Sequence, residues 1–276
     1  MTDEATSPPP FAAAQVPRVP TARRYASLRS IVALMMREMA TSYGKSPGGY
    51  IWALLEPLAT IAVLSVAFSV IFRQPSIGTS FILFYASGMM PFTMFSTVSQ
   101  KLAQSFSFSR QLLTYPAVSF IDALLARVAV TLLTQVMVGF VVFTAILTLA
   151  DTRSVPNLPL ILMSYGLAVL FGIGVGMVNA FLMTRFPIWV VAWSVATRPL
   201  FLISGILFIF NGLPQELQRF IWYNPLIHIV GTMRAGFYPT YKWDYVSWIY
   251  AFAMSLVLIV IGLRLLKWYH RDLLQA

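Results

Sequence analysis

The chain has no cysteine, only two histidines, and few charges: 10% of its 276 residues are Asp, Glu, Lys or Arg. Without cysteine there is no disulfide framework and no metal or redox site built on thiolates. The histidines, His228 and His270, lie far apart in sequence and have no other candidate ligands beside them, so no metal site is predicted. Typical soluble domains carry about 25% charged residues, so the scarcity of charge argues against a soluble domain.

Hydrophobic residues make up 58% of the chain, and its mean hydropathy is +0.76. This composition predicts an all-α integral membrane protein. The 19 Lys and Arg exceed the 9 Asp and Glu, giving a net charge of +10, which is compatible with either nucleic acid or an anionic membrane surface. Most of the basic residues flank apolar stretches, which favours the membrane and predicts no nucleic-acid partner.

The N-terminal part divides into two segments. Residues 1–20 contain Asp3, Glu4 and five prolines and have no apolar core like that of a signal peptide, so we expect a disordered cytoplasmic tail. Residues 22–46 have helical periodicity, with Leu28, Val32 and Met39 on one face, and we expect an amphipathic helix at the membrane interface.

Six apolar stretches are long enough to cross about 30 Å of hydrocarbon as helices. They span residues 51–72, 81–98, 128–150, 158–184, 188–210 and 246–266, and the third helix is expected to start earlier, near Ser119. Before the last stretch, residues 211–245 contain an apolar run that is too short to cross and is broken by Asn224-Pro225. We expect a re-entrant pair of short helices there.

Orientation follows from the basic residues. If both termini are cytoplasmic, only Arg73, Arg153, Arg219, Arg234 and Lys242 lie on the outer side, and Arg198 falls within the fifth stretch. The excess of positive charge inside favours cytoplasmic termini and places residues 211–245 on the outer side.

The chain has no ATP site of its own. Gly44-Lys45-Ser46 resembles the end of a phosphate-binding loop, but the required earlier glycine position is Met39 and no strand precedes it. No nucleophile–base arrangement is present, so an enzyme is not predicted. The ionisable residues well inside the apolar stretches reduce to Glu56 and Arg198, which is little for an ion-coupled carrier.

A series of motifs, in order, carries a resemblance to a known family. They begin with Met36-Arg37-Glu38-Met39 and Tyr43-Gly44-Lys45, then Trp52-Ala53-Leu54-Leu55-Glu56-Pro57. Further along are Ile121-Asp122 with Ala126-Arg127, then Arg198-Pro199-Leu200, and finally Trp222-Tyr223-Asn224-Pro225-Leu226-Ile227-His228. From about residue 25 the chain resembles the permease subunits of type-2 ABC exporters, most closely those for capsular polysaccharide. Tyr223 is an insertion relative to the family pattern.

The resemblance implies a transmembrane domain over residues 21–276 in the bacterial inner membrane that works as a homodimer with two ATPase subunits. It implies ATP and magnesium on those partners, no cofactor in this chain, and a periplasmic adaptor with an outer-membrane channel. It also implies a coupling loop at residues 101–116, whose exposed apolar residues call for a partner or lipid. The candidate ATPase contacts are Arg37, Glu38, Lys45, Phe106, Phe108, Arg110, Leu112 and Leu113. The alternative is a loop packed on its own helices.

Arg198 is the sharpest substrate candidate. A charge near the bilayer middle costs about 2.5–3.5 kcal/mol or more unless it is paired or hydrated, and Pro199 frees a backbone carbonyl. We expect a cationic contact for an acidic, lipid-linked polysaccharide; the alternatives are a pair with Glu56 or a snorkelling side chain. Other candidates for the substrate path are Trp222, Tyr223 and His228, although interfacial anchoring accounts for most aromatics in this region.

Three other functions remain open from the sequence. A related permease for O-antigen or teichoic acid has the same architecture, and neighbouring genes would distinguish it. An ion-coupled anion carrier would work without an ATPase partner. A membrane scaffold would fold and persist without transport.

Overall fold

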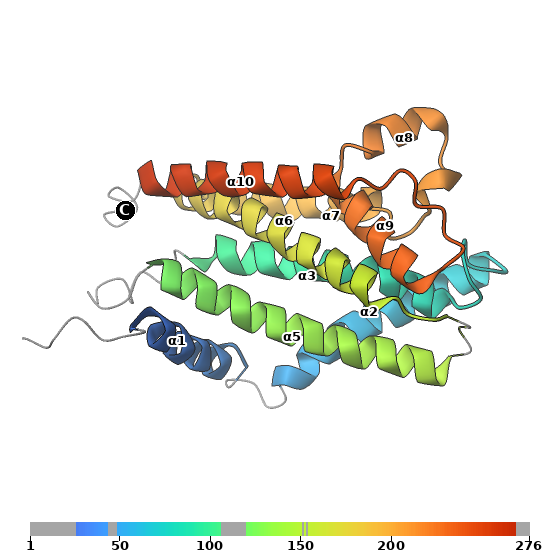
Figure 1. Cartoon of the computed structure of the whole chain (residues 1–276), viewed down its shortest axis with the longest axis horizontal. Helices are drawn as coiled ribbons and strands as arrows, with labels where there is room; N and C mark the ends of the chain where they lie inside the picture. The colour runs from blue at the N-terminus through green and yellow to red at the C-terminus, as the bar shows by residue number, and fades with distance from the viewer. Residues whose placement is uncertain (1–25, 44–48, 106–119, 151, 153, 269–276) are drawn as a thin grey trace, which may run out of the picture.

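The computed structural model describes residues 26–43, 49–105, 120–150, 152 and 154–268, and all regular structure within these ranges is helical (Figure 1). The helices are α1 (Ala26–Tyr43), α2 (Gly49–Ile71), α3 (Phe81–Ala103), α5 (Phe120–Leu149), α6 (Leu158–Arg185), α7 (Ile188–Ile203), η1 (Phe210–Gly212), α8 (Gln215–Ile221), α9 (Pro225–Phe237) and α10 (Trp248–Trp268). The expectation of an all-helical protein is confirmed for the described residues.

Five of these helices, α2, α3, α5, α6 and α10, are long and apolar enough to cross a membrane. The fifth predicted stretch, 188–210, is shorter than expected, because α7 ends at Ile203. At 1.5 Å per residue its 16 residues extend about 24 Å, less than the hydrocarbon thickness of about 30 Å.

The early end of α7 has a local cause. Gly205 adopts a left-handed φ of +78°, a conformation that glycine enters without steric cost, and this stops the helix. Beyond it the carbonyls of Ile206 and Phe208 accept hydrogen bonds from the guanidinium of Arg234, at 2.9 and 2.6 Å. These bonds replace the helical N–H donors that the unwound carbonyls would otherwise lack.

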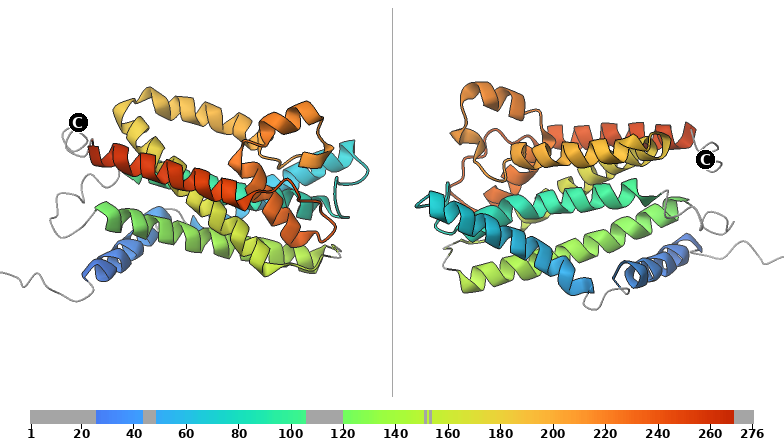
Figure 2. Two further views of the ribbon diagram at one scale, coloured as in Figure 1. Left: turned by 45° about the horizontal axis from the view of Figure 1, so that its top comes forward. Right: turned by 180° about the vertical axis from the view of Figure 1, so that it is seen from behind.

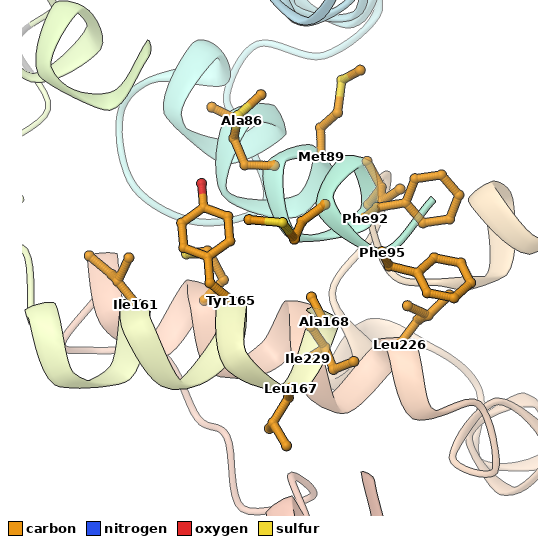
Figure 3. Packing of buried hydrophobic residues seen from close by; sticks show 14 of the residues in the cluster. Ala86, Met89, Phe92, Phe95, Ile161, Tyr165, Leu167, Ala168, Leu226 and Ile229 are labelled. Atoms are coloured by element: carbon orange, nitrogen blue, oxygen red, sulfur yellow. The ribbon is translucent and has the colours of Figure 1, made fainter. Parts of the chain in front are cut away.

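The core lies between α3, α6 and α9. Figure 3 shows Tyr165 of α6 pointing toward α3, with Ile229 of α9 alongside α6. Helix α10 packs on the other side of α6, while α5 covers α3, and α7 runs along the outside of the bundle with none of its side chains buried (Figure 2).

Glycines on α6 let its neighbours approach closely. A Cβ on Gly176 would lie 2.9 Å from the backbone oxygen of Ser99 in α3, and one on Gly174 would lie 3.0 Å from that of Ser255 in α10. Positions two apart in a helix face different directions, so α6 presents backbone to both neighbours. The glycines at 172, 174 and 176 therefore form a close-packing surface of α6.

The segment 211–245 contains the two short helices α8 and α9. Asn224 caps α9, its side chain accepting a hydrogen bond from the Leu226 N–H at 3.1 Å, and Pro225 occupies the first turn, where no N–H is needed. The predicted break at Asn224-Pro225 is therefore confirmed. All residues of α9 are buried, whereas none of α8 is.

Helix α1 lies against the start of α5 (Figure 1). Leu28, Val32 and Met39, the predicted apolar face, are exposed, while Glu38 turns toward α5. The predicted tail 1–20 lies outside the described residues. So do Lys45, Phe106, Phe108, Arg110, Leu112 and Leu113, so most of the predicted coupling loop is not described.

Candidate functional site

A groove with a volume of about 620 Å³ lies between α7, the C-terminal half of α3 and the last turn of α6. We call it the Arg198 groove. Its lining is Phe92, Phe95, Ser96, Ser99, Gln100, Ala103 and Gln104 from α3, Met183 from α6, and Val190, Trp193, Ser194, Thr197, Arg198 and Phe201 from α7. Aromatic faces, hydroxyls, amides and the guanidinium of Arg198 converge there, and none of the lining side chains that the structure describes is acidic.

Arg198 is exposed along the groove. Among the described residues, no hydrogen bond or ion pair engages its guanidinium, and no ion pair links it to Glu56, which is itself exposed on α2. Within one subunit this argues against the structural pair considered as an alternative. Helix α7 continues through Pro199 and ends at Ile203.

The start of α7 is fixed to α6 by one hydrogen bond. Trp189 Nε1 donates to Asn179 Oδ1 at 2.9 Å, and Asn179 is buried. This bond sets the spacing between α6 and α7 at the end where the groove opens, so the wall carrying Arg198 has a defined position although its side chains are not buried.

Ser99 lies in the floor of the groove with an unusual environment. It is 1% exposed, and its hydroxyl has no hydrogen-bond partner among the residues that the structure describes. Buried hydroxyls are normally satisfied, and an exception calls for an explanation such as a ligand or water. Sequence reasoning missed Ser99, because a serine within an apolar helix gives no signal until its neighbours are known.

The motif Trp222–His228 forms a bonded cluster at the far end of the molecule. His228 is fully buried; its Nδ1 accepts from the Ser247 N–H at 3.3 Å, so its Nε2 carries the proton that is donated to the Trp222 carbonyl at 2.9 Å. Burial lowers the pKa of His228 below its ordinary value, in keeping with a neutral ring.

The aromatic rings around His228 complete this cluster. Trp222 Nε1 donates to the Tyr245 carbonyl at 3.0 Å, and the rings of Trp222 and Tyr250 lie 5.0 Å apart. Burial also raises the pKa of the Tyr245 phenol well above its usual range. Of the predicted substrate-path residues here, Trp222 and His228 have their polar groups engaged by the chain itself, and only Tyr223 is exposed.

Arg234 is a buried cation that sequence reasoning placed among the outer-side charges. It is 1% exposed, donates to two backbone carbonyls, and lies over the Phe84 ring at 4.2 Å. No described carboxylate pairs with it. The available signal was its place within the apolar run 225–237, since a charge in such a run needs partners.

Arg127 joins three helices at the end of the bundle where α1 lies. Its Nε and Nη2 donate to the two carboxylate oxygens of Glu38 at 3.1 and 3.4 Å, and its Nη1 donates to the Lys101 carbonyl at 3.2 Å. Ser27 Oγ donates to Asp122 Oδ1 at 2.5 Å nearby. Glu38 is thus turned into the protein, whereas Arg37, the neighbouring ATPase-contact candidate, is exposed.

No metal site emerges from the described ranges: nowhere in them do three or more His, Cys, Asp or Glu side chains group closely enough to hold an ion. The candidate site consists of the places where charged, polar and aromatic side chains converge. Its parts are the Arg198 groove, the Arg127 junction and the Trp222–His228 cluster.

Comparison with known proteins gives one consistent picture. A family model described as ABC-2 type transporter matches residues 29–238. The chain is 28% identical over 238 residues to the polysialic acid transport protein KpsM of Escherichia coli, covering 86% of this chain and 92% of that one. It is 26% identical to the capsule polysaccharide export inner-membrane proteins CtrC of Neisseria meningitidis (85% and 89% coverage) and BexB of Haemophilus influenzae (87% and 90%).

Proposed function

Because the chain belongs to the ABC-2 type transporter family, we propose that it is the membrane subunit of an ATP-driven exporter of capsular polysaccharide. The cargo is a lipid-linked, acidic polymer that moves from the cytoplasm across the bacterial inner membrane. The observation that carries this proposal is the similarity along most of both chains to KpsM, CtrC and BexB, whose names all refer to polysaccharide transport or export.

The chain acts as a pair, and two separate ATPase subunits bind ATP and magnesium. Support for a separate energy source comes from the sequence, because Gly44-Lys45-Ser46 lacks the earlier glycine of a phosphate-binding loop. A periplasmic adaptor and an outer-membrane channel continue the path to the cell surface.

The end of the bundle that carries α1 faces the cytoplasm, as do both termini. The charges support this orientation: Lys101, Arg127, Arg185, Arg264 and Lys267 lie where α3, α6 and α10 end and α5 begins. Helix α7 together with the unwound residues after Ile203 makes the sixth crossing, and the α8–α9 pair re-enters from the periplasmic side. The complete burial of α9 supports re-entry, since its polar backbone ends are shielded from lipid by protein.

The ATPase docks on α1 and the loop 101–116. The exposed Arg37 supports docking on α1, and the exposed side chains of Leu28, Val32 and Met39 suit contact with lipid at the interface. Arg198 supplies positive charge to the acidic cargo. The absence of any acidic side chain lining its groove supports that role.

Deletion of the gene tests the proposal directly. Polymer trapped in the cytoplasm, with none on the surface and recovery when the wild-type gene is restored, is the expected result. Normal capsule with loss of surface O-antigen or teichoic acid would move the assignment to those cargoes. Normal surface polymers of every kind would reject polysaccharide export.

A further inference from the structure

The Arg198 groove is formed entirely by residues of a single subunit. It is bounded by three helices of the same chain, and its volume of about 620 Å³ lies within the 300–1,000 Å³ typical of small-molecule sites. It does not depend on a second copy for its walls. Figure 2 shows α7, which forms its outer wall, running along the outside of the bundle.

Two polar groups in the groove lack partners. Among the described residues nothing pairs with the Arg198 guanidinium, and the Ser99 hydroxyl is buried without any hydrogen bond. A free cation attracts an oxyanion, and an unsatisfied buried hydroxyl attracts a hydrogen-bonding atom of the same ligand. Trp193 offers an aromatic face, and Gln100 and Gln104 offer exposed amides at the mouth, which are groups that bind hydroxylated rings and polyols.

The depth of the groove matches a lipid headgroup. Arg198 lies ten residues into α7, about 15 Å from its start, and arginine side chains on helices point back toward the helix N-terminus. For α7 that direction is the basic end, so the guanidinium reaches toward the headgroup level of the cytoplasmic leaflet.

We propose that the Arg198 groove binds the oxyanion and adjoining hydroxylated part of an anionic lipid headgroup from the cytoplasmic leaflet, one per subunit. Arg198 pairs with the oxyanion and Ser99 donates to the headgroup. The identification of that lipid with the anchor end of the exported polymer rests on the proposed function. The binding of an anionic headgroup does not.

Native mass spectrometry of the purified full-length chain tests this site. The probes are phosphatidylglycerol and phosphatidylcholine with identical acyl chains, titrated into wild type, Arg198→Gln, Ser99→Ala and Arg264→Gln. Arg264 is the matched control because it is an exposed arginine in α10 that does not line the groove. A uronic-acid trisaccharide without lipid serves as competitor, which separates a phosphate headgroup from a sugar carboxylate as the source of the oxyanion.

The wild type and Arg264→Gln are expected to prefer phosphatidylglycerol over phosphatidylcholine by about tenfold, the typical effect of one charge-assisted hydrogen-bonded contact. Arg198→Gln is expected to lose that preference. Ser99→Ala, which removes a hydroxyl that bonds nothing in the fold, is expected to keep the protein stable and weaken binding severalfold. Competition by the trisaccharide would assign the site to sugar carboxylates, and its absence would assign it to phosphate.

Equal retention of both lipids by wild type, together with no trisaccharide binding, would overturn the proposal. An unchanged preference of Arg198→Gln for phosphatidylglycerol would also overturn it. An unchanged affinity of Ser99→Ala for phosphatidylglycerol would show that the headgroup does not bind in the groove. Because binding is measured without export, the site and the proposed function fail separately. If the lipid preference depends on Arg198 but deletion of the gene leaves surface polymers normal, the binding site is supported and capsule export is rejected.

Discussion

Loss of the Arg127–Glu38 pair is expected to destabilise the protein and to weaken the contacts that hold α1, α3 and α5 together. The pair is bidentate, and the two side chains are 8% and 12% exposed, so removal of one partner leaves a nearly buried charge. Breaking a buried pair in this way costs about 3–5 kcal/mol. Because some solvent reaches these side chains, we expect Arg127→Met to cost about 3 kcal/mol, or roughly 100-fold in the folded-to-unfolded ratio.

The assay is unfolding of the purified chain in mixed micelles, with surface polysaccharide measured in cells that carry the same variants. Arg37→Met is the matched control, because Arg37 is the exposed neighbour of Glu38 on α1, and its loss should change stability by no more than about 0.5 kcal/mol. The charge-swapped double variant, Glu38→Arg with Arg127→Glu, should recover part of the loss. Recovery will be incomplete because a glutamate cannot donate to the Lys101 carbonyl as Arg127 does.

Two results would refute this reasoning. Arg127→Met with wild-type stability would mean that the pair contributes no more than an exposed ion pair does. A double variant no better than the worse single variant would mean that the charges do not interact, since interacting neighbours give coupling energies of about 0.5–3 kcal/mol.

Three further outcomes are expected. Gly176→Leu should abolish folded protein on size exclusion, because even a Cβ there meets the Ser99 backbone of α3, whereas Gly166→Leu, where nothing lies within 4 Å, should be tolerated. Arg234→Met should lower the unfolding midpoint in the same assay, because it leaves the Ile206 and Phe208 carbonyls without donors. Arg234→Lys should recover only part of that loss of stability. His228 binds fewer protons folded than unfolded because burial lowers its pKa, so stability should fall as pH drops below about 6.5, and this slope should be smaller in His228→Asn.

Composition and periodicity were sufficient to predict the helical class and most helix positions. Long apolar stretches admit few other structures, and the helices α2, α3, α5, α6 and α10 lie where the sequence places them. The end of α7 was not predictable in the same way. It depends on Gly205 adopting a left-handed conformation and on Arg234, 29 residues further along, supplying donors to the unwound backbone. Neither the conformation of Gly205 nor the hydrogen bonds of Arg234 can be inferred from the mean hydropathy of a stretch of sequence.

The candidate site also has parts that the sequence could predict and parts that it could not. Arg198 was identifiable because a lone charge in an apolar stretch is costly wherever it lies. The groove around it was not, since it is assembled from α3, α6 and α7, and Ser99 acquires its significance only from the absence of a bonding partner in the fold. Glu38 was placed among the candidate ATPase contacts by the family resemblance. Its pair with Arg127, 89 residues away in the sequence, was not predictable from the sequence alone.

The two arginines in apolar segments illustrate how structure separates a structural charge from a functional one. Arg234 donates to two carbonyls and covers the Phe84 ring, so the fold itself supplies the interactions that stabilise its charge, and its loss should be felt as instability. Arg198 has no such contacts among the described residues and lies exposed on a helix with no buried side chain. Its removal should therefore leave the fold of the subunit nearly unchanged and weaken only the proposed binding of an anionic headgroup.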